Sequence, residues 1–126
     1  MPQAHYKLTI ETQGDRLLAH ATGDRTLDTV TAMTIEIFQA ALAARISKVL
    51  VDVWELKGRL GLLDSYVVVN AVFGKLRGQG LSQAAIVDEP MPSLREWSLE
   101  TIARNRGFNI RIFINREDAL EWLEMS

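Results

Sequence analysis

The stretch that decides the fold is Lys48-Val49-Leu50-Val51-Asp52, a short apolar run that ends in a carboxylate. Two similar runs follow at Gln83–Asp88 and Asn109–Phe113, and a helix-length segment precedes each of them. Strands with this spacing need crossover connections, which place them parallel to one another in a single sheet. The sequence therefore predicts an α/β fold with three parallel βα units.

Two alternating segments precede this pattern. Tyr6–Glu11 alternates apolar and polar residues, and Arg16–Thr22 does so again after the turn residues Gln13-Gly14-Asp15. Alternation with a period of two is typical of a strand with one buried face, and a glycine turn between two such segments is typical of a hairpin. We expect an antiparallel hairpin beside the parallel strands, which gives a five-stranded mixed sheet.

A helix is expected between the hairpin and the Lys48–Asp52 strand. Thr26 or Asp28 can cap its start, and it runs to about Ala44. Its apolar residues form two strips, and together these exceed the width of an ordinary core-facing stripe. The second strip consists of Ile35, Phe38 and Leu42. A wide buried face and a surface for a partner or ligand both remain open as explanations.

A second helix is predicted at Leu62–Leu76 from apolar residues at helical spacing, although the β-branched run at Tyr66–Val69 would also suit a strand. Val68 and Val72 lie off the main apolar stripe of this helix, so a partner subunit can cover them. The residues that we expect in a self-association surface are Ile35, Phe38, Leu42, Val68 and Val72.

Local signals place the remaining elements. The segment Val53–Gly61 is interpreted as a long loop, and loops after parallel strands are the usual place for binding sites. Ser93 and Glu96 form a capping box for a helix that runs to Asn105. Asn115 can cap a last short helix.

The composition is that of one globular domain over residues 1–126. A formal net charge of −2 without a basic stripe predicts no binding to nucleic acid. The absence of cysteine excludes disulfides and thiolate chemistry, and the two histidines, His5 and His20, have no metal-ligand spacing. No signal-peptide pattern and no apolar stretch of about 18–20 residues is seen, so we expect a cytoplasmic protein without a transmembrane segment.

The order of these elements resembles that of the STAS family, which includes the bacterial anti-sigma-factor antagonists. The resemblance rests on Val49–Asp52, Ala85–Asp88 and Asn115–Leu123, whose acidic-acidic-Ala-Leu-x-Trp-Leu pattern is the most distinctive part. It covers nearly the whole chain and looks closest to an uncharacterised branch grouped with CRAL-TRIO lipid-binding folds. The resemblance implies a STAS-like sheet and a non-catalytic regulatory or protein-interaction module of the bacterial cytoplasm, with a protein partner or self-association.

The antagonists of that family carry an Asp-Ser-Ser-Gly sequence at the start of the helix after the third strand, and a partner kinase phosphorylates its serine. The matching place here reads Asp64-Ser65-Tyr66-Val67, which keeps the Asp-Ser pair and lacks the second serine and the glycine. The resemblance therefore implies a candidate phospho-switch at Ser65 beside Asp64. The alternative is a serine that only caps the helix or is simply exposed.

Acidic residues follow two of the predicted strands. Asp52 and Asp88 end these strands, at the edge where open α/β sheets bind ligands, and Glu55 and Glu89 come shortly after them. Carboxylates brought together there could perform acid–base chemistry or hold a hard cation, whereas the plainer alternative is that they cap loops and stay solvated. No nucleophile or phosphate-binding glycine loop accompanies them, so we expect no catalytic residue, no metal and no cofactor.

Aromatic residues near this edge suggest a pocket for a small apolar or lipid-like ligand, and core or loop packing is the alternative for each of them. The candidate ligand or partner edge consists of Asp52, Trp54, Glu55, Arg59, Tyr66, Asp88, Met91 and Trp97. An interaction module ranks first among the functions, and a binder of a small apolar ligand ranks second. A hydrolase or lyase that uses Asp52 and Asp88 ranks last, because two carboxylates without a partner motif are common.

Overall fold

The computed structural model describes residues 6–58, 67–68, 82–89 and 109–125. The chain begins with the predicted hairpin, in which β1 (Tyr6–Gln13) and β2 (Arg16–Asp24) run antiparallel. Gln13 lies opposite Arg16, and Gly14 between them has a φ of 63°, which suits a glycine at the first position of a tight turn.

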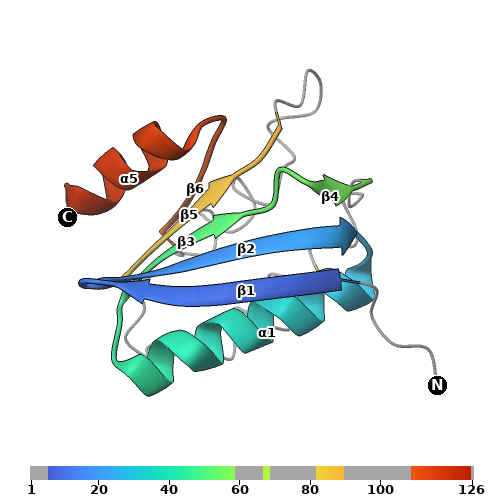
Figure 1. Cartoon of the computed structure of the whole chain (residues 1–126), viewed down its shortest axis with the longest axis horizontal. Helices are drawn as coiled ribbons and strands as arrows, with labels where there is room; N and C mark the ends of the chain where they lie inside the picture. The colour runs from blue at the N-terminus through green and yellow to red at the C-terminus, as the bar shows by residue number, and fades with distance from the viewer. Residues whose placement is uncertain (1–5, 59–66, 69–81, 90–108, 126) are drawn as a thin grey trace.

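Three strands of four or five residues extend the sheet on the β2 side. They are β3 (Lys48–Asp52), β5 (Gln83–Val87) and β6 (Ile110–Phe113), and all of these run parallel to β2, in the spatial order β1-β2-β3-β5-β6. The prediction of a mixed sheet with one antiparallel hairpin is confirmed (Figure 1).

One strand was not expected from the sequence. The two-residue strand β4 (Leu56–Lys57) pairs with β2 at Gly23 and Asp24, inside the segment that the sequence analysis interpreted as a loop. It makes the sheet six-stranded. A strand of this length is too short to show any alternation, so pattern analysis could not find it.

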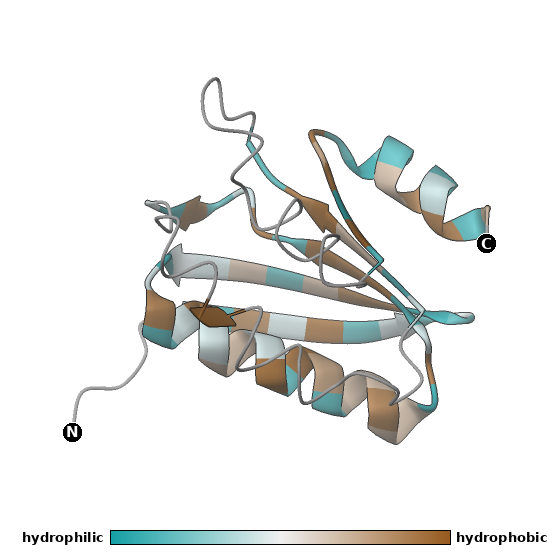
Figure 2. Cartoon of the chain, turned by 180° about the vertical axis from the view of Figure 1, so that it is seen from behind, coloured by the Kyte–Doolittle hydropathy of each residue, from teal (hydrophilic) through white to brown (hydrophobic). Residues whose placement is uncertain are grey.

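Two helices cover opposite faces of the sheet, α1 (Leu27–Ala44) on one side and α5 (Arg116–Glu124) on the other (Figures 1 and 2). Successive strand residues point to opposite faces, so neighbours in the sequence enter different cores. The core under α1 includes Leu17, Ala19, Val49, Ile37, Phe38 and Ala41. The core under α5 includes Leu18, Leu50, Ala85, Ala119 and Leu123. Burial on both faces explains why these strands are apolar runs rather than alternating ones.

Both helices begin where the sequence predicts. The Thr26 hydroxyl accepts a hydrogen bond from the backbone N–H of Thr29, 3.1 Å away, and the Thr29 hydroxyl accepts one from the backbone N–H of Thr26. Asn115 caps α5 by accepting from the backbone N–H of Asp118 at 2.8 Å. These side chains satisfy backbone donors that the first turn of a helix leaves unpaired.

The two other predicted helices fall largely outside the described residues. Within Leu62–Leu76 only residues 67 and 68 are described, and both are helical, which agrees with a helix at that point. The helix predicted to follow Ser93 lies entirely outside the described residues and stays a prediction.

The structure corrects the expected self-association surface at two residues, and the rest of that surface stays a prediction. Phe38 is 6% exposed and Val68 is fully buried, so neither side chain offers surface to a second copy. Ile35 is 41% exposed and Leu42 is half-buried, while Val72 lies outside the described residues. Phe38 is buried because the core under α1 reaches further around the helix than a single stripe of residues would require.

Helix α1 also corrects the expectation that no segment is long and apolar enough to cross a membrane. Its 18 residues meet that requirement by length and composition. However, Met33, Ile37 and Ala41 are buried, and the core under α1 joins its residues to those of the sheet. We therefore interpret α1 as the core helix of the domain.

Candidate functional site

The carboxyl ends of β3 and β5 meet at one edge of the sheet, as the sequence predicts. Asp52 lies opposite Val87 in the parallel register, so Asp88 follows directly beside it. The backbone N–H of Val53 donates to the Val87 carbonyl at 2.9 Å, and that of Asp88 donates to the Phe113 carbonyl at 2.9 Å. These bonds extend the sheet pairing by one residue and fix the backbone where the loops begin.

A buried ion pair joins this edge to the start of α1. The two terminal nitrogens of Arg25 donate to the two carboxylate oxygens of Asp88 at 2.7 and 3.0 Å. The side chains of Arg25 and Asp88 are only 11% and 8% exposed. One of the Arg25 nitrogens also donates to the Val53 carbonyl at 3.1 Å, and the backbone N–H of Glu89 donates to Asp88 Oδ1 at 2.8 Å. Paired bonds of this kind are strong and directional, so Arg25 ties together three segments of the chain.

The sequence analysis missed Arg25. It lies 63 positions from Asp88 in the sequence, in a short polar connection between β2 and α1. Nothing in its immediate neighbours distinguishes it from an exposed loop arginine, so only the three-dimensional pairing identifies its role.

A tight turn after β3 presents Trp54 and Glu55. The Asp52 carboxylate accepts a hydrogen bond from the backbone N–H of Trp54 at 3.1 Å, an arrangement that aspartate commonly makes at the start of a turn. The backbone N–H of Leu56 then donates to the Val53 carbonyl at 3.0 Å, and the pairing of β4 with β2 holds the far end. Trp54 is 39% exposed although both ends of its turn are fixed.

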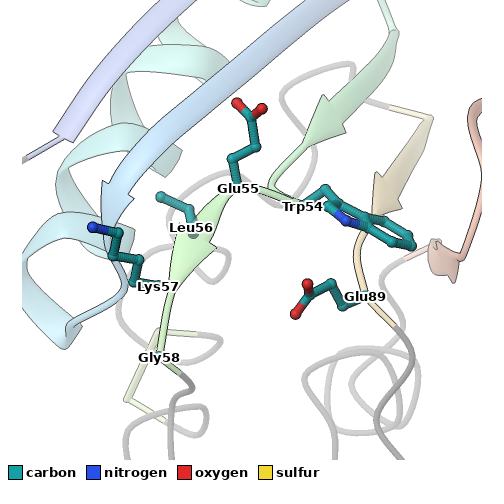
Figure 3. A pocket seen from close by; sticks show the side chains of 6 residues that line it. All are labelled: Trp54, Glu55, Leu56, Lys57, Gly58 and Glu89. Carbon is teal, nitrogen blue, oxygen red and sulfur yellow. The ribbon is translucent and has the colours of Figure 1, made fainter.

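An open depression of about 500 Å³ lies beside this turn. It is lined by Trp54, Glu55, Leu56, Lys57, Gly58 and Glu89 (Figure 3). The Trp54 ring and the Glu89 side chain lie on one side, and Leu56 and Lys57 of β4 lie on the other. Leu56 is buried, so the indole ring is the main apolar surface that a ligand or partner would contact here.

Among the described residues that line the depression, two are acidic and one is basic. Glu55 follows Trp54 in the chain and Glu89 lies on the same side of the depression as the indole, while Lys57 contributes one positive charge on the other side. The Glu55 carboxylate lies 3.2 Å from His20 Nε2, and both side chains are well exposed, at 61% and 42%. An aromatic face beside carboxylates is a suitable surface for a cationic group of a binding partner.

The structure brings together four residues of the predicted edge, and the other four lie outside the described residues. Asp52, Trp54, Glu55 and Asp88 lie at the carboxyl ends of β3 and β5 with Glu89, as the order of the strands predicts. Arg59, Tyr66, Met91, Trp97 and the pair Asp64 and Ser65 fall outside the described residues. Within residues 6–58, 67–68, 82–89 and 109–125, no group of three or more histidine, cysteine or acidic residues could hold a metal ion.

Comparison with known proteins identifies the fold. No family model and no curated protein matches the chain. Among solved structures, an uncharacterised protein of the DUF3478 family with a SpoIIAA-like fold, from Shewanella loihica PV-4, is similar at 25% identity and a TM-score of 0.59 over 98% of both chains. An anti-sigma factor antagonist from Mycobacterium paratuberculosis is similar at 16% identity and a TM-score of 0.60 over 94% of both chains. The chain is therefore a STAS-like domain in its fold, which confirms the resemblance drawn from the sequence.

Proposed function

We propose that this STAS-like chain is a non-catalytic regulatory module that binds another protein through Trp54, Glu55 and Glu89, which we call the Trp54 rim. The observation that carries the proposal is the 39% exposure of Trp54 on a turn whose two ends are hydrogen-bonded in place. Tryptophan is the residue type most enriched among the side chains that dominate protein–protein affinity. A turn that is already rigid loses little conformational entropy when a partner binds.

The charge of the rim favours a basic partner surface. Glu55 and Glu89 provide carboxylates on the two loops that flank the depression. Complementary charge raises the association rate and selects among partners, and an arginine or lysine of the partner can stack on the indole face. We therefore expect the partner to present a cationic side chain to Trp54.

The contacts of Asp52 and Asp88 favour a structural role for these two residues rather than a role in acid–base chemistry. The Asp88 side chain is 8% exposed and accepts the paired hydrogen bonds of Arg25, and Asp52 accepts a hydrogen bond from the backbone N–H of Trp54. A general acid or base must reach the proton that it transfers, and the buried Asp88 is poorly placed for this. Both carboxylates instead shape the loops that carry the Trp54 rim.

The comparisons suggest the kind of partner. One similar structure is described as an anti-sigma factor antagonist, and we extend from it the proposal that this chain binds a regulatory protein in the cytoplasm of a bacterium. Ser65 beside Asp64 stays our candidate for a phospho-switch on that interaction. Phosphorylation would introduce as many as about two negative charges there, and such a change in charge can create or disrupt contacts with a partner.

Site-specific photo-crosslinking in lysate of the source cells tests this proposal. A photoreactive phenylalanine derivative replaces Lys57, an exposed residue that lines the depression beside the Trp54 rim, in one variant and Asp15 in a control variant. Asp15 has an 81% exposed side chain in the β1–β2 turn, at the opposite end of the strands. We expect one protein to be captured from position 57 and not from position 15. Equal capture from both positions, or capture from neither, would contradict the proposal.

The same depression favours a second candidate function, the binding of a small amphiphile. Its volume of about 500 Å³ lies within the range of ligand sites, and Trp54 and Leu56 supply apolar lining. Three charged side chains also line it, so an amphiphile with a cationic head fits better than a fully apolar ligand. We expect such an amphiphile to change the tryptophan fluorescence of the wild type and not that of Trp54→Phe. An unchanged wild-type signal would remove this alternative.

A further inference from the structure

Strand β1 forms one side edge of the sheet. Only β2 pairs with it among the described residues, and it is eight residues long. The outer side of an edge strand presents a row of unpaired backbone N–H and C=O groups, which can accept another strand. The outer side of β1 is a different part of the molecule from the Trp54 rim, which lies at the carboxyl ends of β3 and β5.

The hairpin turn determines which backbone groups point outward. A two-residue turn that begins with glycine joins Gln13 to Arg16, and residues that flank such a turn exchange hydrogen bonds with each other. Pairing in an antiparallel ladder alternates, so every second residue of β1 bonds to β2. The backbone groups that remain point outward, and they belong to Tyr6, Leu8, Ile10 and Thr12.

The side chains of β1 are sorted between its two faces. Tyr6, Leu8 and Ile10 are partly buried, and Leu8 and Ile10 pack against the core under α1. Lys7, Thr9 and Glu11 are exposed on the opposite face. Any strand that joins this edge must therefore match an apolar face on one side and a Lys-Thr-Glu face on the other.

We propose that this partner strand is β1 of a second copy of the chain, paired antiparallel across a two-fold axis with Thr9 opposite Thr9. In this register Lys7 lies opposite Glu11 of the second copy, and Glu11 lies opposite Lys7. Leu8 lies opposite Ile10 on the other face. Cross-strand pairs of opposite charge and of two threonines both stabilise antiparallel pairing, and the outward backbone groups of the two strands coincide.

Other registers lack this complementarity. A shift by one residue places outward groups opposite inward ones and puts the two α1 helices on opposite faces of the joined sheet. A shift by two residues keeps the faces but places Lys7 opposite Thr9 or Gln13, so no charges pair. The sequence of β1 is thus self-complementary in one register, which is the argument for a second copy rather than an unrelated strand.

A cysteine at position 9 tests the register directly. The chain contains no cysteine, so Thr9→Cys introduces the sole thiol. Residues opposite each other in a non-hydrogen-bonded pair have Cα atoms about 4.5 Å apart, which a disulfide can span. In the control variant Glu11→Cys the two thiols lie about four residues apart along the strands, roughly 13 Å, which is too far. We expect oxidised Thr9→Cys to run as a disulfide-linked dimer and oxidised Glu11→Cys to run as a monomer.

Charge reversal gives an independent test by analytical ultracentrifugation of the wild type and its variants. Lys7→Glu and Glu11→Lys each place like charges opposite one another twice, and we expect each to weaken the dimer about tenfold or more. The double variant Lys7→Glu/Glu11→Lys restores both pairs and should dimerise as the wild type does. All these side chains are exposed, so folding should be unaffected. A wild type that stays monomeric at its highest soluble concentration would overturn the proposal, and so would a double variant no better than the single ones.

Discussion

Replacing Arg25 with methionine tests whether the buried ion pair holds the loop edge of the sheet together. Arg25→Met keeps most of the apolar stem of the side chain and removes the guanidinium. It thereby deletes two hydrogen bonds to Asp88, at 2.7 and 3.0 Å, and one to the Val53 carbonyl, at 3.1 Å. The Asp88 carboxylate would remain in a site where its side chain is 8% exposed.

The expected cost is large because the remaining charge is desolvated. Removing one partner of a buried ion pair typically lowers the free energy of unfolding by about 3–5 kcal/mol. A domain of this kind has about 5–15 kcal/mol in total, so the variant should lose a substantial part of its stability. Arg16→Met is the matched control, because Arg16 lies 3.5 Å from Glu124 and the Glu124 side chain is 67% exposed. Such a partly exposed pair contributes about 0–1 kcal/mol.

Urea unfolding followed by far-ultraviolet circular dichroism measures these differences. The double variant Arg25→Met/Asp88→Leu removes both charges and should regain most of the stability that Arg25→Met loses, because the buried carboxylate that lost its guanidinium partner is removed as well. The reasoning is refuted if Arg25→Met is destabilised as little as Arg16→Met. It is also refuted if the double variant is no more stable than Arg25→Met.

Three further predictions concern the two helices and β1. Thr26→Ala should lower the free energy of unfolding by about 1 kcal/mol through loss of the α1 cap, as measured in urea, and Thr26→Ser should not. Burial, and then the hydrogen bond to Glu36, raise the pKa of Tyr6 above its ordinary value. The native state therefore holds the phenol proton more tightly than the unfolded chain does. The stability that the protonated Tyr6 contributes is complete below the ordinary pKa and is lost as the pH rises through the raised Tyr6 pKa. In urea unfolding at alkaline pH, Tyr6→Phe should therefore lose less stability with rising pH than the wild type. Leu123→Ala should cost about 2–5 kcal/mol in the same assay because Leu123 is fully buried, whereas Met125→Ala, at a residue 74% exposed, should cost less than about 0.5 kcal/mol.

The sheet could be predicted because the apolar runs that form its strands are local in the sequence and recur along it. Val49 and Leu50 face opposite cores, and both cores are apolar, so the Lys48–Asp52 run is apolar throughout. The caps at Thr26 and Asn115 were found for the same reason, since each depends on side chains within a few residues. Helix-length spacing between the apolar runs then implied parallel strands and the order of the elements.

The candidate site was only partly predictable. The order of parallel strands brings Asp52 and Asp88 to one edge, but it does not indicate which of them is buried. That distinction depends on Arg25, which meets Asp88 across 63 positions of sequence. The exposure of Trp54 likewise depends on β4, a two-residue strand without a periodic pattern.

Isothermal titration calorimetry of the crosslinked partner, once purified, tests the role of the Trp54 rim most directly. An anchoring tryptophan typically contributes at least about 2 kcal/mol to binding, so Trp54→Ala should raise the dissociation constant about 30-fold or more. Met125→Ala, a change at another exposed side chain, should leave it unchanged. A Trp54→Ala variant that folds normally and binds the partner as tightly as the wild type would contradict the proposed function.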